Sequence, residues 1–306
     1  MATVTDDPDL LAPVPRVRAP RRGLSLPRVR SLLGTVPFFA YVTVFLAIPT
    51  LVVVIGAFAG DGGFTLDNVT ALGEGYVLDA FGRSILLSAI TAILGAAFGA
   101  VLAYALATAR PGGLLRRVVT AASGVLAQFG GVTLAFAFLA TIGLSGFVTV
   151  FLRDRLGVDI YGGGVWLFEL PGLALVYTYF QIPLMVIVFL PALDGIRPQW
   201  REATESLGGT TWQYWTRVAG PLLAPAFLGS TLLLFANAFS AYATAAALVS
   251  QGNPIVPLQI RSALTSEVVL GQQNLGKAMA LGMVVVVAVV MALYALLQKR
   301  TARWLG

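Results

Sequence analysis

The chain has 306 residues, of which 58% are hydrophobic and 11% are charged, and it contains no cysteine and no histidine. A soluble domain carries about 25% charged residues, so this chain has too few charges to cover a water-facing surface, and the composition predicts a membrane protein. The lack of Cys and His excludes disulfides, thiolate or imidazole metal sites and catalytic dyads built on either residue. We therefore expect neither a metal site nor a cofactor.

The first 30 residues are rich in arginine and proline and show no apolar periodicity. Such a segment cannot bury enough apolar surface to fold, so we expect a disordered basic cytoplasmic tail over 1–30 and a membrane domain over 31–306. Signal cleavage after the small residues Ala57–Ala59 is a disfavoured alternative, because the apolar run before them is far longer than an h-region of about 7–15 residues.

Six long intervals without a charged residue follow, and each can hold a helix of about 20 residues that crosses the bilayer. They are Ser31–Gly60, Ser84–Ala109, Val118–Leu152, Leu170–Leu193, Val218–Ile260 and Ala278–Gln298. In the fifth interval the segment Ser250–Pro254 ends the apolar run, so we expect one span there, near Leu222–Val249. The count predicts an all-α protein with six transmembrane helices.

The basic residues favour one orientation of these helices. With both termini in the cytoplasm, the inside segments hold 15 of the 20 Lys and Arg residues and the outside segments hold 5. Positive residues are retained in cytoplasmic loops, so this orientation is the predicted one. The same bias explains the high isoelectric point, and we expect no nucleic-acid partner.

Polar residues within the apolar intervals are few and uncharged. Hydrogen bonding between helices is the first interpretation of such residues, and the lining of a solute pathway is the second. The pathway candidates are Gln128, Gln181, Asn237 and Tyr242. Since none is a carboxylate or an ammonium group, a proton- or sodium-coupled carrier is disfavoured. Gly95 and Gly99 form a G-x-x-x-G pair, which favours helix packing over a dedicated dimer contact.

The longest charged connection between the intervals is Asp194–Arg217. Pro198 can begin a helix there and Gly208 with Gly209 can end it. At spacing i, i+3, i+4, i+7 the helix would carry an apolar stripe of Trp200, Ala203, Thr204 and Leu207. A helix in the membrane interface, followed by an aromatic belt of Trp212 and Trp215, is the simplest interpretation. The chain has no G-x-x-x-x-G-K-[ST] phosphate loop, so any use of ATP requires a partner.

This loop resembles the EAA loop of ABC-importer permeases, whose pattern is E-A-A-x3-G-x9-I-x-L-P. The spacing matches throughout: Glu202, Ala203, Gly208 and Pro221 agree with the pattern, whereas Thr204, Val218 and Gly220 replace Ala, Ile and Leu. The resemblance implies that the loop forms the coupling helix that docks into a groove on a cytoplasmic ATPase. The residues implied in ATPase coupling are Trp200, Glu202, Ala203, Thr204, Leu207, Gly208 and Pro221.

Other stretches, Phe64–Leu72, Leu102–Ala107 and Asn274–Gly282, are similar to permeases of the spermidine/putrescine branch. The resemblance implies the type I ABC-importer permease fold and a transport subunit that is not itself an enzyme. It also implies an inner-membrane location and four partners: an ATPase dimer, a second permease that is similar or identical, an extracytoplasmic solute-binding protein and the lipid bilayer.

A polyamine is the solute that this likeness favours, with ferric iron, phosphonate, sulfate or another small solute as the alternative. A stand-alone channel or secondary carrier, in which the loop is only interfacial, is a second hypothesis for the function. A membrane enzyme is a third, but without Cys or His it would need a set of carboxylate or Ser/Lys groups that the apolar intervals do not contain.

Overall fold

The structure, a computed structural model, describes residues 27–60, 63–110, 112–249, 255–265 and 272–305. The chain divides into two compact units, Met1–Leu51 and Val52–Gly306, and each is described by itself. Residues 1–26 of the predicted tail lie outside the described residues. α1 (Pro27–Val42) begins inside the segment that we expected to be disordered. The segment Ser250–Pro254 also lies outside the described residues.

The first unit is one helical stretch with an apolar surface. α1 continues through a π-helical turn, η2 (Thr43–Ala47), into α2 (Ile48–Ala57), which runs on into the second unit. Pro37 lies inside α1 without ending it. Large apolar side chains such as Phe38, Phe45 and Leu46 are exposed, as expected for a helix whose natural solvent is lipid.

Within the described residues, six helical segments are long and apolar enough to cross a membrane. They are Thr35–Ala57, Gly75–Thr108, Val132–Leu156, Leu170–Asp194, Thr211–Ser240 and Gln273–Leu296. The predicted all-α fold with six spans is therefore confirmed. The described chain adds one hairpin that the sequence did not indicate, in which β1 (Ala59–Gly60) pairs antiparallel with β2 (Gly63–Phe64).

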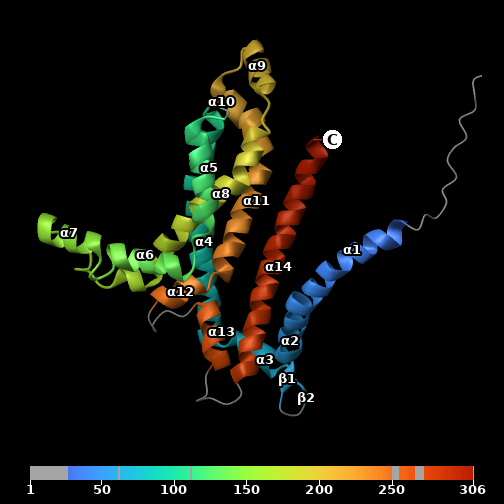
Figure 1. The fold of residues 1–306 in the computed structure, drawn as a ribbon, viewed down its shortest axis with the longest axis vertical. Coiled ribbons are helices and arrows are strands. Elements are labelled where there is room, and N and C mark those ends of the chain that lie inside the picture. Colours follow the sequence, from blue (N-terminus) through green and yellow to red (C-terminus); the bar gives the residue numbers. More distant parts are fainter. Residues whose placement is uncertain (1–26, 61–62, 111, 250–254, 266–271, 306) are drawn as a thin grey trace, which may run out of the picture. The chain divides into compact units, whose positions relative to one another are not determined.

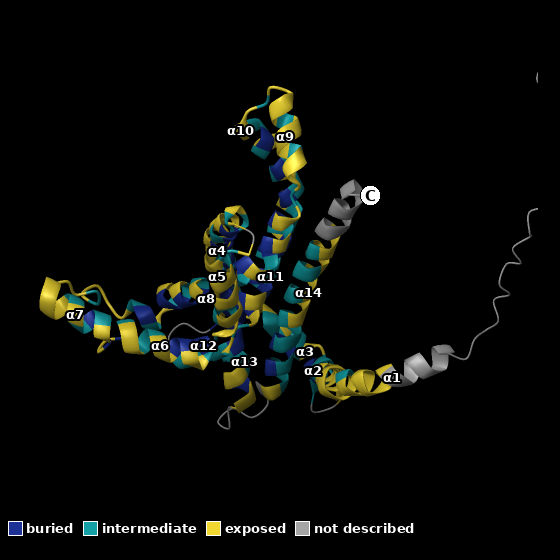
Figure 2. Ribbon diagram, turned by 45° about the horizontal axis from the view of Figure 1, so that its top comes forward, coloured by how far each residue is buried: buried dark blue, intermediate teal, exposed yellow. Residues whose placement is uncertain are grey.

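The core of the second unit lies where three long helices pack together (Figures 1 and 2). These are α4 (Gly75–Thr108), α8 (Leu170–Asp194) and α11 (Gly220–Ser240), with α5 (Leu114–Gln128) against α8 and α14 (Gln272–Leu305) against α11. A Cβ added at Gly95 would lie 2.4 Å from the Cβ of Gln181, and one at Gly99 would lie 2.5 Å from the Cβ of Met185. The G-x-x-x-G pair therefore packs α4 against α8 within this chain.

Two of the six intervals each hold a candidate span together with further, shorter helices. The interval Val118–Leu152 divides among α5, α6 (Val132–Ile142) and α7 (Phe147–Leu156). Gly131, before α6, has φ +76°, a conformation that glycine adopts without steric cost, so the chain turns there. The span expected near Leu222–Val249 breaks after Ser240, and α12 (Ala243–Leu248) follows.

Shorter elements connect these helices. They are α3 (Asp67–Thr70), η3 (Ala71–Gly73), η4 (Trp166–Phe168), α9 (Pro198–Ser206), α10 (Thr211–Tyr214), the π-helical turn η5 (Trp215–Ala219) and α13 (Val256–Thr265). In Figure 1, α9 and α13 lie at opposite ends of the bundle formed by α4, α8 and α11. Two of the helix breaks, the one before α6 and the one before α12, build the site described next.

Candidate functional site

The loop between α8 and α11 forms a short helix with defined ends. α9 begins at Pro198, as predicted, and the chain leaves it through a Schellman motif. The backbone N–H of Gly209 donates to the Thr204 carbonyl, and that of Gly208 donates to the Glu205 carbonyl, each at 2.9 Å. Gly208 has φ +76°, so this end of the helix depends on a residue without Cβ.

The tip of this loop presents apolar side chains that the bundle does not cover. Leu207 is 89% exposed and Trp212 is 76% exposed. Of the predicted stripe, Trp200 and Thr204 are half-buried, whereas Ala203 is exposed along with Leu207. Exposed apolar side chains at the end of a loop can contact a partner protein or the membrane interface.

Charged residues surround the stripe on α9. Glu202 is exposed. Arg201 donates from Nε to the Glu205 carboxylate at 3.0 Å, one helical turn away. This hydrogen bond raises the pKa of Arg201, so the guanidinium keeps its charge. Both side chains are more than half exposed, and solvent screening leaves their ion pair little effect on stability.

The loop is joined to the bundle by a second short helix that the sequence did not indicate. A capping box starts α10, in which the Thr210 hydroxyl accepts from the backbone N–H of Gln213 and the Gln213 side chain accepts from that of Thr210. Trp215 then packs edge-on against Tyr104 of α4, with ring centroids 5.4 Å apart. The two tryptophans, expected to form one belt, therefore differ: Trp215 anchors the loop and Trp212 faces outward. Pro221 lies in the first turn of α11, where a proline fits a helix start.

An ion pair ties the start of the loop to α5. The Arg116 guanidinium donates to the carboxylate of Asp194, the last residue of α8, at 2.5 Å. The Arg116 side chain is only 20% exposed. Because α5 leads from Arg116 to Gln128, this contact connects the loop to the second feature of the site.

That second feature is a cavity of about 300 Å³ where the two helix interruptions meet. Three of the four pathway candidates, Gln128, Asn237 and Tyr242, line it together. The other described residues of the lining are Ala127, Gly130, Gly131, Phe180, Ser240, Ala241, Ala243 and Thr244. The cavity therefore combines polar side chains with backbone that has left the helix, as solute sites inside membrane proteins do.

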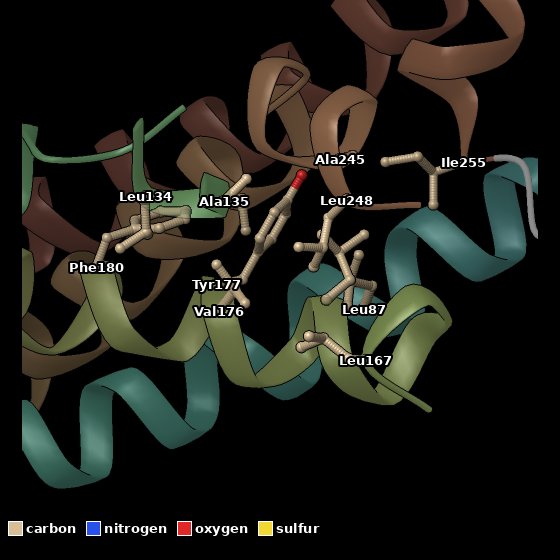
Figure 3. Close-up of a cluster of buried hydrophobic side chains, with 12 residues drawn as sticks. Leu87, Leu134, Ala135, Leu167, Val176, Tyr177, Phe180, Ala245, Leu248 and Ile255 are labelled. Atoms are coloured by element: carbon tan, nitrogen blue, oxygen red, sulfur yellow. The ribbon is translucent and has the colours of Figure 1, made fainter. Parts of the chain in front are cut away.

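The interrupted backbone is held by two buried hydroxyls. Thr244 Oγ1 accepts from the Gly131 N–H at 2.9 Å and donates to the Gly131 carbonyl at 3.2 Å. Tyr177, from α8, donates its hydroxyl to the Ala241 carbonyl at 2.6 Å. Figure 3 shows the Tyr177 ring among the buried apolar side chains, with its oxygen directed away from α8. Each hydroxyl satisfies backbone groups that no water would reach inside a membrane.

Gln181, the fourth pathway candidate, does not join the cavity. Its side chain is fully buried, and Nε2 donates to the Leu234 carbonyl at 2.8 Å. The structure thus places Gln181 between α8 and α11, where the first interpretation, an interhelical hydrogen bond, applies. Thr244 and Tyr177 were not among the predicted site residues, although Gly130 and Gly131 inside an apolar run were an available signal for the break before α6.

Together these features define a helical protein that crosses the membrane several times, with an exposed helical loop at one end of the bundle and an open cavity at the helix breaks. Residues 99–303 match the family described as "Binding-protein-dependent transport system inner membrane component". The match covers more than half of the chain, so the chain belongs to this family of inner-membrane components.

The names of the curated relatives refer to different ions. The chain is 28% identical over 195 residues to the ferric transport system permease protein FbpB of Actinobacillus pleuropneumoniae, covering 62% of this chain and 27% of that protein. It is 29% identical over 168 residues to the sulfate permease CysT of Escherichia coli, covering 54% and 57%. It is 26% identical over 279 residues to the sulfate permease CysW of Synechococcus elongatus, covering 86% and 87%. The chain thus spans about a quarter of the first relative and little more than half of the second.

Solved structures share the fold. A bacterial ABC transporter involved in the import of the polysaccharide alginate superposes with a TM-score of 0.68 and 18% identity, covering 90% of this chain and 96% of that chain. An inward-facing methionine ABC transporter gives 0.50 and 15% identity, covering 74% and 99%. The fold is therefore that of ABC-importer permeases, as the resemblance implied.

Proposed function

We propose that this chain is a permease subunit of an ATP-driven importer, which forms part of the solute pathway and couples it to a partner ATPase. The observation that carries the proposal is the continuity between loop and cavity. The exposed Leu207 is followed by α10, η5 and α11, and α11 ends at the cavity with Asn237 and Ser240. A push on the loop can therefore move one wall of the cavity as a rigid body.

The proposed assembly follows from the same elements. A dimer of cytoplasmic ATPase subunits would receive the tip of the loop, where Leu207 and Trp212 are exposed. A second permease, similar or identical, would complete the pathway, and an extracytoplasmic binding protein would deliver the solute. The proposed orientation places both termini and the loop in the cytoplasm, in keeping with the distribution of Lys and Arg. The chain itself would hydrolyse no ATP.

For the solute we propose a small inorganic ion. The relatives named above are ferric and sulfate permeases, and a molybdenum permease of Escherichia coli is 26% identical over 119 residues. The polyamine favoured by the sequence analysis has no support among these relatives. It also lacks support in the cavity, whose described lining includes none of the carboxylates that would pair with a polyamine.

The coupling role is tested by Leu207→Glu, with Leu207→Met as the matched control. A charge in an apolar docking groove costs about 2 kcal/mol or more, so ATP-driven uptake in membrane vesicles is expected to fall at least about tenfold. The ATPase should no longer co-purify, while the amount of permease in the membrane stays unchanged. Leu207→Met should retain both the uptake and the co-purifying ATPase. A Leu207→Glu variant that keeps its ATPase and its uptake would contradict the proposal, and uptake without ATP would favour a channel or carrier.

A further inference from the structure

A second cavity adjoins the first on the side away from the coupling loop. It is a wide-open, mostly apolar groove with a volume of about 430 Å³, and it shares Ser240 and Tyr242 with the first. Its other described lining residues come from α13 and α14: Pro257, Ile260, Arg261, Leu264, Thr265 and Met283. Because α13 lies at the end of the bundle opposite α9 (Figure 1), the two cavities lead from that end inward to the interrupted helices.

The described lining of these two cavities carries charge of one sign. Among the described residues that line them, Arg261 is the one with a formal charge, and none is a carboxylate. Deeper in, the polar groups are the side-chain amides of Gln128 and Asn237 and the phenol of Tyr242. Each can donate or accept a hydrogen bond, so the preference for one sign of charge comes from Arg261. Ser240 already donates its hydroxyl to the Ala236 carbonyl at 2.9 Å, so its oxygen contributes only as an acceptor.

This arrangement suits an anion and disfavours a cation. Arginine or lysine at a constriction selects anions, whereas cation pathways carry Asp or Glu. The planar guanidinium also matches the geometry of an oxyanion through two parallel hydrogen bonds. A ferric ion or a polyamine would be repelled by Arg261 and would find no carboxylate along the described lining. A volume of about 300 Å³ for the inner cavity lies at the small end of ligand sites, which suits an ion better than an oligosaccharide.

We propose that the two cavities form an entry route for a tetrahedral oxyanion of the sulfate or molybdate type, with Arg261 as the residue that selects it. The inference rests on the proposed function, because it assigns the substrate class to that same pathway. Arg261 attracts and orients the anion at the mouth. The amides and the phenol then replace part of its hydration shell at the helix interruptions, where neutral donors let it leave again.

The test is uptake by vesicles that contain the complete importer, with sulfate, molybdate and ferric ion as separate labelled probes. Wild type is expected to take up an oxyanion and to exclude ferric ion. Arg261→Gln should raise KM about tenfold or more, the effect of losing a charge-assisted hydrogen bond, with a smaller change in the maximal rate. The KM of Arg261→Lys should lie between the values for wild type and Arg261→Gln. Arg155→Gln, which alters an exposed arginine of α7 outside both cavities, should match wild type.

Two results would overturn the anion route: ATP-driven uptake of ferric ion with neither oxyanion, or an Arg261→Gln variant with the KM of the Arg155→Gln control. These results leave the importer assignment intact. Conversely, uptake of sulfate or molybdate that depends on Arg261 but continues after removal of ATP and the ATPase would overturn the proposed function and leave the anion route standing.

Discussion

The coupling loop and the cavity are built in opposite ways. Hydrogen bonds that shape the tip of the loop join residues three to five positions apart, such as Gly209 to Thr204, and the tip is exposed. The bond that shapes the cavity joins Gly131 to Thr244, 113 positions apart, and Thr244 is buried. The loop therefore depends on local backbone conformation and on its partner, whereas the cavity depends on the packing of α6 against α12. Substitutions in the two regions should therefore impair transport in different ways.

The largest effect on transport is expected from Gly208→Val. No atom lies within 4 Å of a Cβ at this position, so the added side chain meets no steric obstacle. The penalty comes from φ +76°, which costs a residue with a Cβ about 1–2 kcal/mol and a β-branched one more. The Schellman end of α9 should open, and uptake should fall to less than about a tenth of wild type with normal membrane levels.

Gly208→Asn is the control for that prediction. Asparagine tolerates the left-handed region better than other residues with a Cβ, so it should recover most of the uptake that valine removes. Equal losses with Asn and Val would show that the position is sensitive to bulk at the partner's surface, and not to backbone conformation. Measuring ATP hydrolysed per ion transported separates these outcomes from a simple loss of protein.

The corresponding test of the cavity is Thr244→Val, which keeps the shape of the side chain and removes its hydroxyl. The Gly131 N–H would then lose its partner, whereas the Gly131 carbonyl would still accept from the Ala135 N–H, and we expect a cost of about 1–3 kcal/mol in the free energy of unfolding. We expect a lower Tm in detergent together with uptake reduced several-fold. Thr244→Ser retains the hydroxyl and should stay close to wild type in both measurements. Normal uptake and a normal Tm in the valine variant would show that the cavity functions without this hydrogen bond.

The same contrast explains what the sequence could predict. Pro198 and the glycines after Leu207 carry their own conformational preference, so the bounds of α9 could be derived from adjacent residues. The six spans followed from charge-free length alone. Local signals alone could not place the breaks. Gly130 and Gly131 are a signal for one of them, but glycine also occurs inside unbroken membrane helices, and Ala241 has no turn preference. The breaks persist because Tyr177 and Thr244, distant in sequence, pair the freed backbone.

A smaller effect is expected at the ion pair that joins the two regions. Arg116 holds Asp194 at the start of the coupling loop, and α5 carries Gln128 to the cavity. The pair is partly exposed, so its loss should cost about 0.5–1 kcal/mol, equivalent to a two- to fivefold lower ratio of ions transported to ATP hydrolysed. Arg116→Gln and Asp194→Asn should lower this ratio alike, because each removes the same contact.

The exchanged pair Arg116→Asp with Asp194→Arg provides the sharper test, since it should restore part of the ratio that each single change removes. Arg117→Gln is the matched control, because it removes a neighbouring arginine that is exposed. If Arg116→Gln behaves like Arg117→Gln, the ion pair does not transmit loop movement, and α11 alone connects the loop to the cavity.

The smallest effect is predicted for Gln181→Met, the pathway candidate that the structure places between helices. Gln181 Oε1 is buried and has no hydrogen-bond partner among the described residues, so methionine removes a group that is costly to bury. The Leu234 carbonyl that now accepts from Gln181 lies inside α11 and keeps its helical partner. The free energy of unfolding should therefore change by less than about 1 kcal/mol, and KM for the solute should not change. Gln128→Met, at the cavity, should instead raise KM. If KM changes in Gln181→Met and not in Gln128→Met, Gln181 contributes to the solute pathway and Gln128 does not.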